Sequence, residues 1–258
     1  MHAGLDGRYL ATKSLDPVAT TGSSILTLRR DAMMSSRSES EGAPFTPAAG
    51  VHWLTPFYDL GVAVLTRESH WRNRLVAQVR PSPDDVIADL GCGTGSLLVK
   101  LGMAARGVKL VGIDPDPTVL DRARAKTRRA GVAVDLIEGF ARDASSLLRG
   151  RAVTKIVSSL VFHQVPLSEK SAALGAAYEA LPSGGELHIA DYGLQRTKLM
   201  RRLFRATVQN LDGMENTEPQ ARGVLPELIR SAGFSEVVEV EVVPTSTGSI
   251  SLIRALRL

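Results

Sequence analysis

Short apolar runs alternate with helical patterns over most of the chain. Apolar side chains recur at helical intervals between residues 51 and 79, which predicts an amphipathic helix or a pair of helices. Beyond residue 85 the apolar runs are short and apolar on both faces, as expected of parallel strands that helices cover on each side. The predicted strands of this kind span 86–91, 109–114, 134–139, 155–161 and 185–192.

The last two apolar runs break this alternation. Residues 235–244 and 248–257 are separated by three residues. Three residues cannot hold a crossover helix, so these two strands must run antiparallel to one another. The pattern therefore predicts an α/β sheet of five parallel strands that ends in a β-hairpin.

The first 48 residues differ from the rest in composition. They contain seven serines, charges of both signs, and Tyr9 and Phe45 as their aromatic residues. Such a segment cannot bury enough apolar surface to offset the entropy lost on ordering. We therefore predict a disordered tail over residues 1–48 and one domain over residues 49–258.

The net charge and the cysteine content limit the kinds of binding partner and the cellular compartment that we predict. A net charge of +4 with 5% aromatic residues is mild for a nucleic-acid binder, so we predict no nucleic-acid partner. Cys92 is the single cysteine, which excludes internal disulfides and a cysteine-based metal site and fits a reducing compartment. The chain has no apolar run near ~18 residues and no apolar secretory signal. We predict a soluble, cytoplasmic protein without a metal.

Glycines alternate with other residues between the first predicted strand and the helix after it. Glycine permits positive φ and lets a ligand approach the backbone, and ligands of such sheets bind at the carboxyl ends of the strands. Ser96 stands where a dinucleotide fingerprint has its third small residue, and no phosphate-binding G-K-[ST] follows. Asp114 ends the second strand, where a carboxylate accepts both ribose hydroxyls of an adenosine. These features predict an adenosine ligand without a phosphate to bind.

The stretch Asp89-Leu90-Gly91-Cys92-Gly93-Thr94-Gly95 resembles the first motif of class I S-adenosylmethionine-dependent methyltransferases. Residues 113–117 resemble the ribose-binding turn of that family, and residues 181–192 resemble its fifth strand with the turn before it. The order of parts, including Tyr58 and Asp59, is similar to the UbiE/COQ5-like small-molecule branch. The resemblance covers residues 51–258. It implies a Rossmann-like sheet of order 3-2-1-4-5-7-6 with the last strand antiparallel, helices on both faces, and S-adenosylmethionine as cofactor.

The resemblance also implies a set of cofactor-binding residues. One departure is Gly139-Phe140-Ala141, where family members often carry Gly-Asp-Ala, with the aspartate accepting from the adenine amino group. Either Phe140 packs on the purine while a backbone N–H near Ala141 meets a ring nitrogen, or Asp143 reaches the adenine. The implied set is Tyr58, Asp89, Gly91, Gly93, Gly95, Asp114, Pro115, Phe140, Ala141, Ser159 and His163.

Methyl transfer from a sulfonium requires alignment and, for some acceptors, a base for the proton. His163 follows the fourth strand, where it acts as a general base, contacts the cofactor, or is an ordinary loop histidine. Asp191 and Tyr192 follow the fifth strand, where they orient or deprotonate the acceptor, or form a helix cap and a pocket wall. We expect His188 to be structural and Cys92 to be a small packing residue.

A small organic acceptor is favoured. The amino-DNA methyltransferase turn [DNS]-P-P-[YFW] is absent after the fourth strand, and Cys92 is misplaced for the Pro-Cys nucleophile of cytosine-C5 enzymes. The basic segment 195–211 follows the fifth strand. This segment could contact an amphiphilic, quinone- or lipid-like acceptor, or it could bind anionic lipid as a peripheral membrane contact. The alternative is that it forms the solvated outer face of a lid helix. Its basic residues at helical spacing are Lys198, Arg201, Arg202 and Arg205.

Two other functions compete with methyl transfer. An NAD(P)-dependent oxidoreductase is disfavoured by Ser96, by the antiparallel ending, and by Tyr178-x-x-x-Pro182, where a short-chain dehydrogenase needs Tyr-x-x-x-Lys. A non-catalytic S-adenosylmethionine-binding protein stays open, because no residue of the chain is chemically indispensable to the transfer.

Overall fold

The computed structural model describes residues 67–258. The tail predicted over residues 1–48, Tyr58 and the part of the predicted helical segment that precedes residue 67 lie outside the described residues. The remainder of that helical segment is present as helix α2 (Glu68–Val79).

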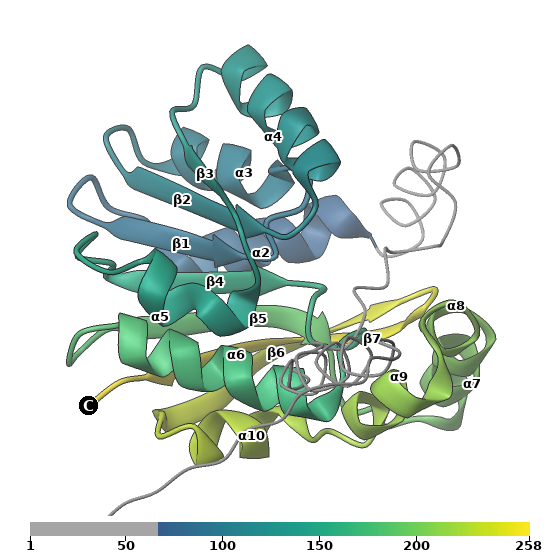
Figure 1. Cartoon of the computed structure of the whole chain (residues 1–258). Helices are drawn as coiled ribbons and strands as arrows, with labels where there is room; N and C mark the ends of the chain where they lie inside the picture. Colours follow the sequence, from purple (N-terminus) through teal and green to yellow (C-terminus); the bar gives the residue numbers. More distant parts are fainter. Residues whose placement is uncertain (1–66) are drawn as a thin grey trace, which may run out of the picture. The chain divides into compact units, whose positions relative to one another are not determined.

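The described residues form a seven-stranded mixed sheet with helices on both faces (Figure 1). The strand order is β3-β2-β1-β4-β5-β7-β6, which confirms the predicted fold. Strands β1 to β5 pair in parallel, while β7 runs antiparallel to both β5 and β6. The strands are β1 (Val86–Leu90), β2 (Lys109–Asp114), β3 (Asp135–Glu138), β4 (Lys155–Ser159), β5 (Glu186–Tyr192), β6 (Ser235–Thr245) and β7 (Gly248–Leu256).

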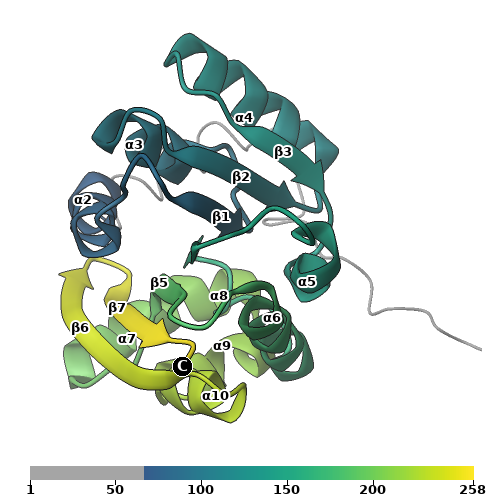
Figure 2. The same cartoon turned by 90° about the vertical axis from the view of Figure 1, so that its left-hand side faces the viewer.

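The helices divide between the two faces of the sheet, as the end-on view in Figure 2 shows. Helices α2, α3, α4 and α7 bury side chains in the apolar cluster on one face, and α5, α6 and α10 in the cluster on the other. Helices other than α2 are α3 (Ser96–Ala104), α4 (Pro117–Arg129), α5 (Ala144–Leu147), α6 (Leu167–Ala180), α7 (Lys198–Ala206), α8 (Val208–Asp212), α9 (Met214–Ala221) and α10 (Leu225–Ser231), and residues Ala141–Asp143 form the 3-10 helix η2.

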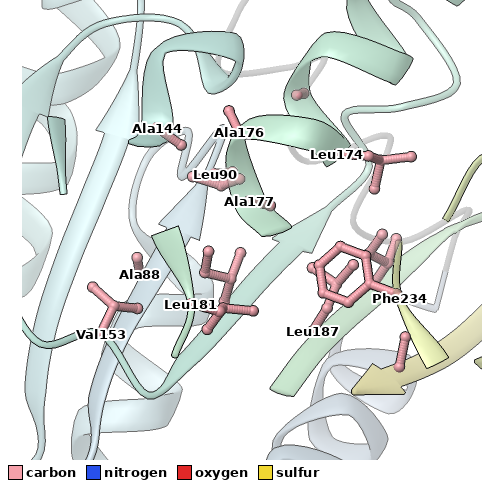
Figure 3. Close-up of a cluster of buried hydrophobic side chains, with 14 of the residues drawn as sticks. Ala88, Leu90, Ala144, Val153, Leu174, Ala176, Ala177, Leu181, Leu187 and Phe234 are labelled. Carbon is pink, nitrogen blue, oxygen red and sulfur yellow. The ribbon is translucent and has the colours of Figure 1, made fainter. Parts of the chain in front are cut away.

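Strand β1 shows why the central strands read as continuous apolar runs. All five of its residues are buried. Ala88 and Leu90 pack in the cluster that Figure 3 shows, while Ile87 faces the cluster on the opposite side of the sheet. Successive side chains of a strand point to opposite faces of the sheet. A strand with helices packed on both faces is therefore apolar at most odd and even positions alike, and in β1 the exception is Asp89.

One predicted element is divided in the structure. The amphipathic pattern over residues 195–211 forms two helices, α7 and α8, instead of one. The break is at Thr207, whose φ of −116° and ψ of −83° are not helical and whose hydroxyl donates to the Leu203 carbonyl at 2.7 Å. Such a bond from a side chain to the preceding turn bends helices. Phe204 and Val208, on either side of the break, are both buried.

Candidate active site

The glycine loop joins β1 to α3 through three residues with positive φ. The φ angles of Gly91, Gly93 and Gly95 are 72°, 54° and 76°. A Cβ on Gly91 would lie 2.3 Å from Cγ2 of Val161, so this position is closed to any side chain. A Cβ on Gly93 would meet no described atom within 4 Å. The loop therefore needs glycine at Gly91 for packing, whereas at Gly93 it leaves open space next to the backbone.

Asp114, at the carboxyl end of β2, braces this loop. Its Oδ2 accepts from the Gly93 amide at 2.9 Å, and its Oδ1 accepts from the Asp116 amide at 3.1 Å. Burial raises the pKa of Asp114, and these two amide donors oppose the rise. A carboxylate has about four acceptor positions, so two remain for hydroxyl donors of a ligand. The adjacent Pro115 is half-buried.

Asp89 is a buried carboxylate beside the glycine loop. It is fully buried, and neither oxygen has a hydrogen-bond partner among the described residues. Burial raises the pKa of Asp89 to about 7, and Arg72 opposes this rise. A buried group of this kind is stabilised by a cation or a donor. S-adenosylmethionine carries a positive sulfonium and a positive amino group, so the orphaned carboxylate and the open space at Gly93 both fit this cofactor.

The loop after β3 contains the predicted adenine contacts. Phe140 is half-buried, and the guanidinium carbon of Arg142 lies 4.2 Å from the centre of its ring. Ala141 begins the 3-10 helix η2, and Asp143 ends it with an exposed side chain. The packing of Phe140 against a purine therefore stays a prediction.

His163 lies in the segment that follows β4, between two carboxylates. Its Nδ1 is 2.8 Å from Oδ1 of Asp191, and its Nε2 is 3.5 Å from Oδ2 of Asp212. The backbone before it is strained, because Leu160, next to Ser159 at the end of β4, has a φ of 57°. Burial lowers the pKa of His163, but the two carboxylates outweigh this effect and raise the pKa to about 9. The structure thus places a buried imidazole between two carboxylates at the carboxyl ends of β4 and β5, an arrangement that favours its protonated form.

Asp191 and Tyr192, which end β5, hold this imidazole in place. Besides His163, the Asp191 carboxylate accepts from the backbone amides of Val161, Phe162 and Tyr192 at 3.0, 2.6 and 2.7 Å. The Tyr192 ring lies edge-on to the His163 ring at 5.0 Å. The Tyr192 hydroxyl hydrogen-bonds the hydroxyl of Thr247 at 2.7 Å, within the core. Both side chains are buried and contact the His163 ring.

Two members of this cluster were not anticipated from the sequence. Asp212 reaches His163 from α8, and Lys170 of α6 is fully buried, donating to the carbonyls of Val165 and Asn216 at 2.6 and 2.8 Å. Burial lowers the pKa of Lys170 to about 8. A signal for Lys170 is its helical spacing with Ala173, Leu174 and Ala177, which places it on the apolar face. No pattern along the chain signals Asp212.

His188 and Cys92 are not part of the cluster around His163. The His188 ring is fully buried, with Nδ1 3.1 Å from Nε2 of Gln78 and Nε2 3.2 Å from Oε2 of Glu186. Burial raises the pKa of the Cys92 thiol, which keeps it protonated. Across residues 67–258 no group of three or more histidine, cysteine, aspartate or glutamate side chains is arranged to hold a metal ion.

The raised pKa of His163 makes stability depend on pH. The folded-state pKa of about 9 exceeds the ordinary value of 6.5, so this contribution is complete below pH 6.5 and lost as pH rises through 9. We expect the wild-type protein to lose unfolding free energy over this window relative to His163→Gln, as measured by urea denaturation. Lys170 is present in both proteins, so its opposite contribution cancels in the comparison. Parallel stability curves would contradict a charged His163.

The comparisons with known proteins agree with this geometry. Residues 87–185 match the family model described as a methyltransferase domain. The matched residues include the glycine loop and His163, and the sheet order is Rossmann-like, so the described region has the fold of such a domain.

Individual relatives match parts of the chain. Indolepyruvate C-methyltransferase from Streptomyces griseus is 29% identical over 172 residues, which are 64% of this chain and 50% of that protein. Demethylmenaquinone methyltransferase from Thermus thermophilus is 32% identical over 142 residues, which are 54% of this chain and 62% of that protein. Ribosomal RNA small subunit methyltransferases also match. The chain spans less than two thirds of the length of these relatives.

Among solved structures, the magnesium protoporphyrin IX methyltransferase of Synechocystis PCC 6803, with bound S-adenosylhomocysteine, is similar in fold. It aligns with a TM-score of 0.56 and 17% identity, over 74% of this chain and 84% of that chain. At this identity the likeness concerns the fold alone.

Proposed function

We propose that this protein transfers a methyl group from S-adenosylmethionine to a small organic acceptor, as in the UbiE/COQ5-like branch. The observation that carries the proposal is the open space at Gly93 near the buried carboxylate of Asp89, which has no hydrogen-bond partner among residues 67–258. A loop built for tight packing alone has no need of that open space, and a buried carboxylate without a partner is costly. A ligand with a positive charge satisfies both features.

The cofactor half of the site would hold S-adenosylmethionine through residues at the ends of β1 and β2. When bound, this cofactor supplies a methyl group on a positively charged sulfur, which an acceptor takes by in-line displacement. Asp114 presents its remaining lone pairs to the ribose hydroxyls while it fixes the Gly93 amide. Asp89 balances positive charge on the methionine portion. The roles of Phe140, Ala141 and Ser159 follow from the resemblance and stay predictions.

The acceptor half of the site centres on His163. An imidazole that is already protonated cannot accept a proton, so His163 serves the acceptor as a donor or a positive charge in this state. Asp191 and Tyr192 are positioning residues in this proposal, because the carboxylate holds the imidazole and three backbone amides of the same loop. The alignment that these residues provide is the main contribution that a protein makes to such a displacement.

The small-molecule class of the acceptor rests on sequence motifs and on the named relatives. The indolepyruvate and demethylmenaquinone enzymes bear the names of small organic substrates. The names of the ribosomal RNA enzymes point instead to nucleic acid, but this chain lacks the amino-methyltransferase turn after β4 and a concentrated basic stripe with aromatics. A quinone- or lipid-like acceptor and a cytoplasmic location stay predictions.

One of the four basic side chains predicted to contact a membrane through residues 195–211 is occupied in an ion pair in the structure. Arg201 forms an ion pair with Glu218, whereas Lys198, Arg202 and Arg205 are exposed. In the part of the chain that is described, no helix combines the length and the apolar character needed to cross a bilayer. Contact with anionic lipid stays a prediction that now rests on three cations.

Binding of S-adenosylhomocysteine tests the proposal, and Asp114→Ala sharpens the test. We expect wild-type protein to bind S-adenosylhomocysteine but not NADH in titration calorimetry, and Asp114→Ala to bind it about 1–3 kcal/mol more weakly. The matched control is Asp116→Ala. Asp116 caps α4 by accepting from the Thr118 and Val119 amides, so its loss lowers stability without removing a ligand contact.

The outcomes separate the three candidate functions. Binding of NADH instead of S-adenosylhomocysteine would favour an oxidoreductase. An Asp114→Ala variant that is folded and binds normally would remove this residue from the site. Cofactor binding without methyl transfer to any acceptor in a broad small-molecule screen would favour the non-catalytic binding protein.

A further inference from the structure

Asp212 connects a short helix to the centre of the acceptor half of the site. It is the last residue of α8, and its carboxylate lies 3.5 Å from Nε2 of His163 with 10% of its side chain exposed. The opposite ring nitrogen of His163 is closer to its own partner, since Nδ1 lies 2.8 Å from Oδ1 of Asp191. The imidazole therefore has one tight acidic partner and one looser acidic partner.

The charges around His163 are arranged for one exchangeable anion. A neutral imidazole has one N–H, so contacts of both ring nitrogens with carboxylate oxygens require the doubly protonated ring. Asp191 of β5 is held by three backbone amides as well as by His163, and Lys170 of α6 adds a positive charge near it. Tyr192 contributes a ring edge without charge. Asp212, the carboxylate next to Nε2, is thus the one of the two anions that does not come from a strand of the sheet.

The helix that carries Asp212 is short and bounded by breaks. Helix α8 has five residues, with non-helical backbone at Thr207 before it and a φ of 83° at Gly213 after it. A helix of this length has little stability of its own and depends on its contacts. On its far side, Asn216 of α9 donates to the Gln164 carbonyl at 3.1 Å. The segment from α8 to α9 thus contacts the loop of His163 through side chains, and buried Lys170 of α6 also donates to the Asn216 carbonyl.

We propose that Nε2 of His163 is an oxyanion subsite, that the Asp212 carboxylate fills it in this structure, and that a carboxylate or enolate oxygen of the acceptor takes the same position. The inference rests on the proposed function, because it names the acceptor class as a small organic anion. The exchange conserves charge. A neutral acceptor that displaced Asp212 would leave a buried imidazolium without its second anion, which is costly, whereas an anionic acceptor would not.

The subsite can be probed with acetate in a variant that lacks the Asp212 carboxylate. In Asp212→Ala, saturated with S-adenosylhomocysteine, we expect the His163 titration midpoint in histidine NMR to fall by about one pH unit, because a nearby carboxylate is lost. Added acetate should restore the midpoint in a saturable manner, while chloride at equal ionic strength should not. His163→Gln assigns the resonance.

Two further proteins complete the experiment. Wild-type protein should show no saturable response to acetate, because Asp212 fills the subsite. Asp212→Asn should show none either, because the amide fills the same space without charge. Asp212→Ser replaces the alanine variant if the latter does not fold.

A folded Asp212 variant whose His163 resonance does not respond to acetate would overturn the proposal. A response of equal size in Asp212→Asn would overturn it as well, because the acetate would then act elsewhere. The proposed function fails separately, through absence of S-adenosylhomocysteine binding by wild-type protein. Acetate rescue measured without that ligand would still report on the subsite in that case.

Discussion

Gly93→Val is expected to weaken binding of S-adenosylhomocysteine at least ~100-fold, which corresponds to about 2.7 kcal/mol. A Cβ at this position would have no neighbour within 4 Å among the described residues, so the valine side chain would enter open space next to the loop. This is the space that the proposed cofactor requires next to the backbone. The φ of 54° also strains a branched residue, by about 1–2 kcal/mol, so a lower melting temperature is expected as well. Calorimetry and thermal denaturation measure the two effects.

Gly131→Val separates the strain from the lost space. Gly131, in the turn between α4 and β3, has a φ of 67°, and its Cβ position also has no neighbour within 4 Å. The variant should therefore show a similar loss of melting temperature and unchanged affinity for the ligand. If Gly93→Val binds as tightly as Gly131→Val does, the cofactor does not lie against the glycine loop.

Asp191→Ala is expected to lower the free energy of unfolding by about 3–5 kcal/mol, the loss typical of breaking a buried charged pair. The alanine leaves the amides of Val161 and Phe162 without an acceptor and leaves His163 without its tight carboxylate partner. We also expect the pKa of His163 to fall, because one of the two carboxylates that raise it is gone. Urea denaturation and histidine NMR are the measurements.

Asp121→Ala provides the matched control for a lost aspartate. Asp121 is largely exposed on α4, where it pairs with Arg124 one turn away. Exposed pairs contribute little, so the loss should stay within about 0.5 kcal/mol. If Asp191→Ala lowers the free energy of unfolding by no more than Asp121→Ala does, the ion pairs and hydrogen bonds around His163 do not stabilise the fold as proposed.

These effects share one architectural cause. The glycine loop and the segment after β4 both follow strands whose carboxyl ends meet at one edge of the sheet, where ligands of such folds bind. The steric contact between the Gly91 position and Val161 shows how closely the two loops approach. Among residues 67–258, Asp89 has no hydrogen-bond partner, whereas His163 has two carboxylate neighbours. This difference is the reason for proposing that the cofactor lies at Asp89 and the exchangeable partner at His163.

The strand order was implied by the resemblance to class I methyltransferases, whereas the sequence by itself determined the strands and the glycine loop. Each of these depends on local patterns: apolar residues at both parities mark a strand that is covered twice, and three residues between β6 and β7 allow only an antiparallel hairpin. Positive φ at Gly91, Gly93 and Gly95 is likewise a local requirement of the turn. These patterns involve residues that are close together in the sequence, so they can be recognised without knowledge of the tertiary structure.

The tertiary structure alone decided which charges meet. The pairing of Arg201 with Glu218 removes a cation from a face that helical spacing had made uniformly basic. Asp212 meets His163 across a helix break that no periodicity marks. Asp89 is buried without a hydrogen-bond partner among the described residues, which no pattern along the chain marks. Burial and ion pairing depend on distances between segments far apart in the chain, and those distances exist once the sheet and its helices have packed.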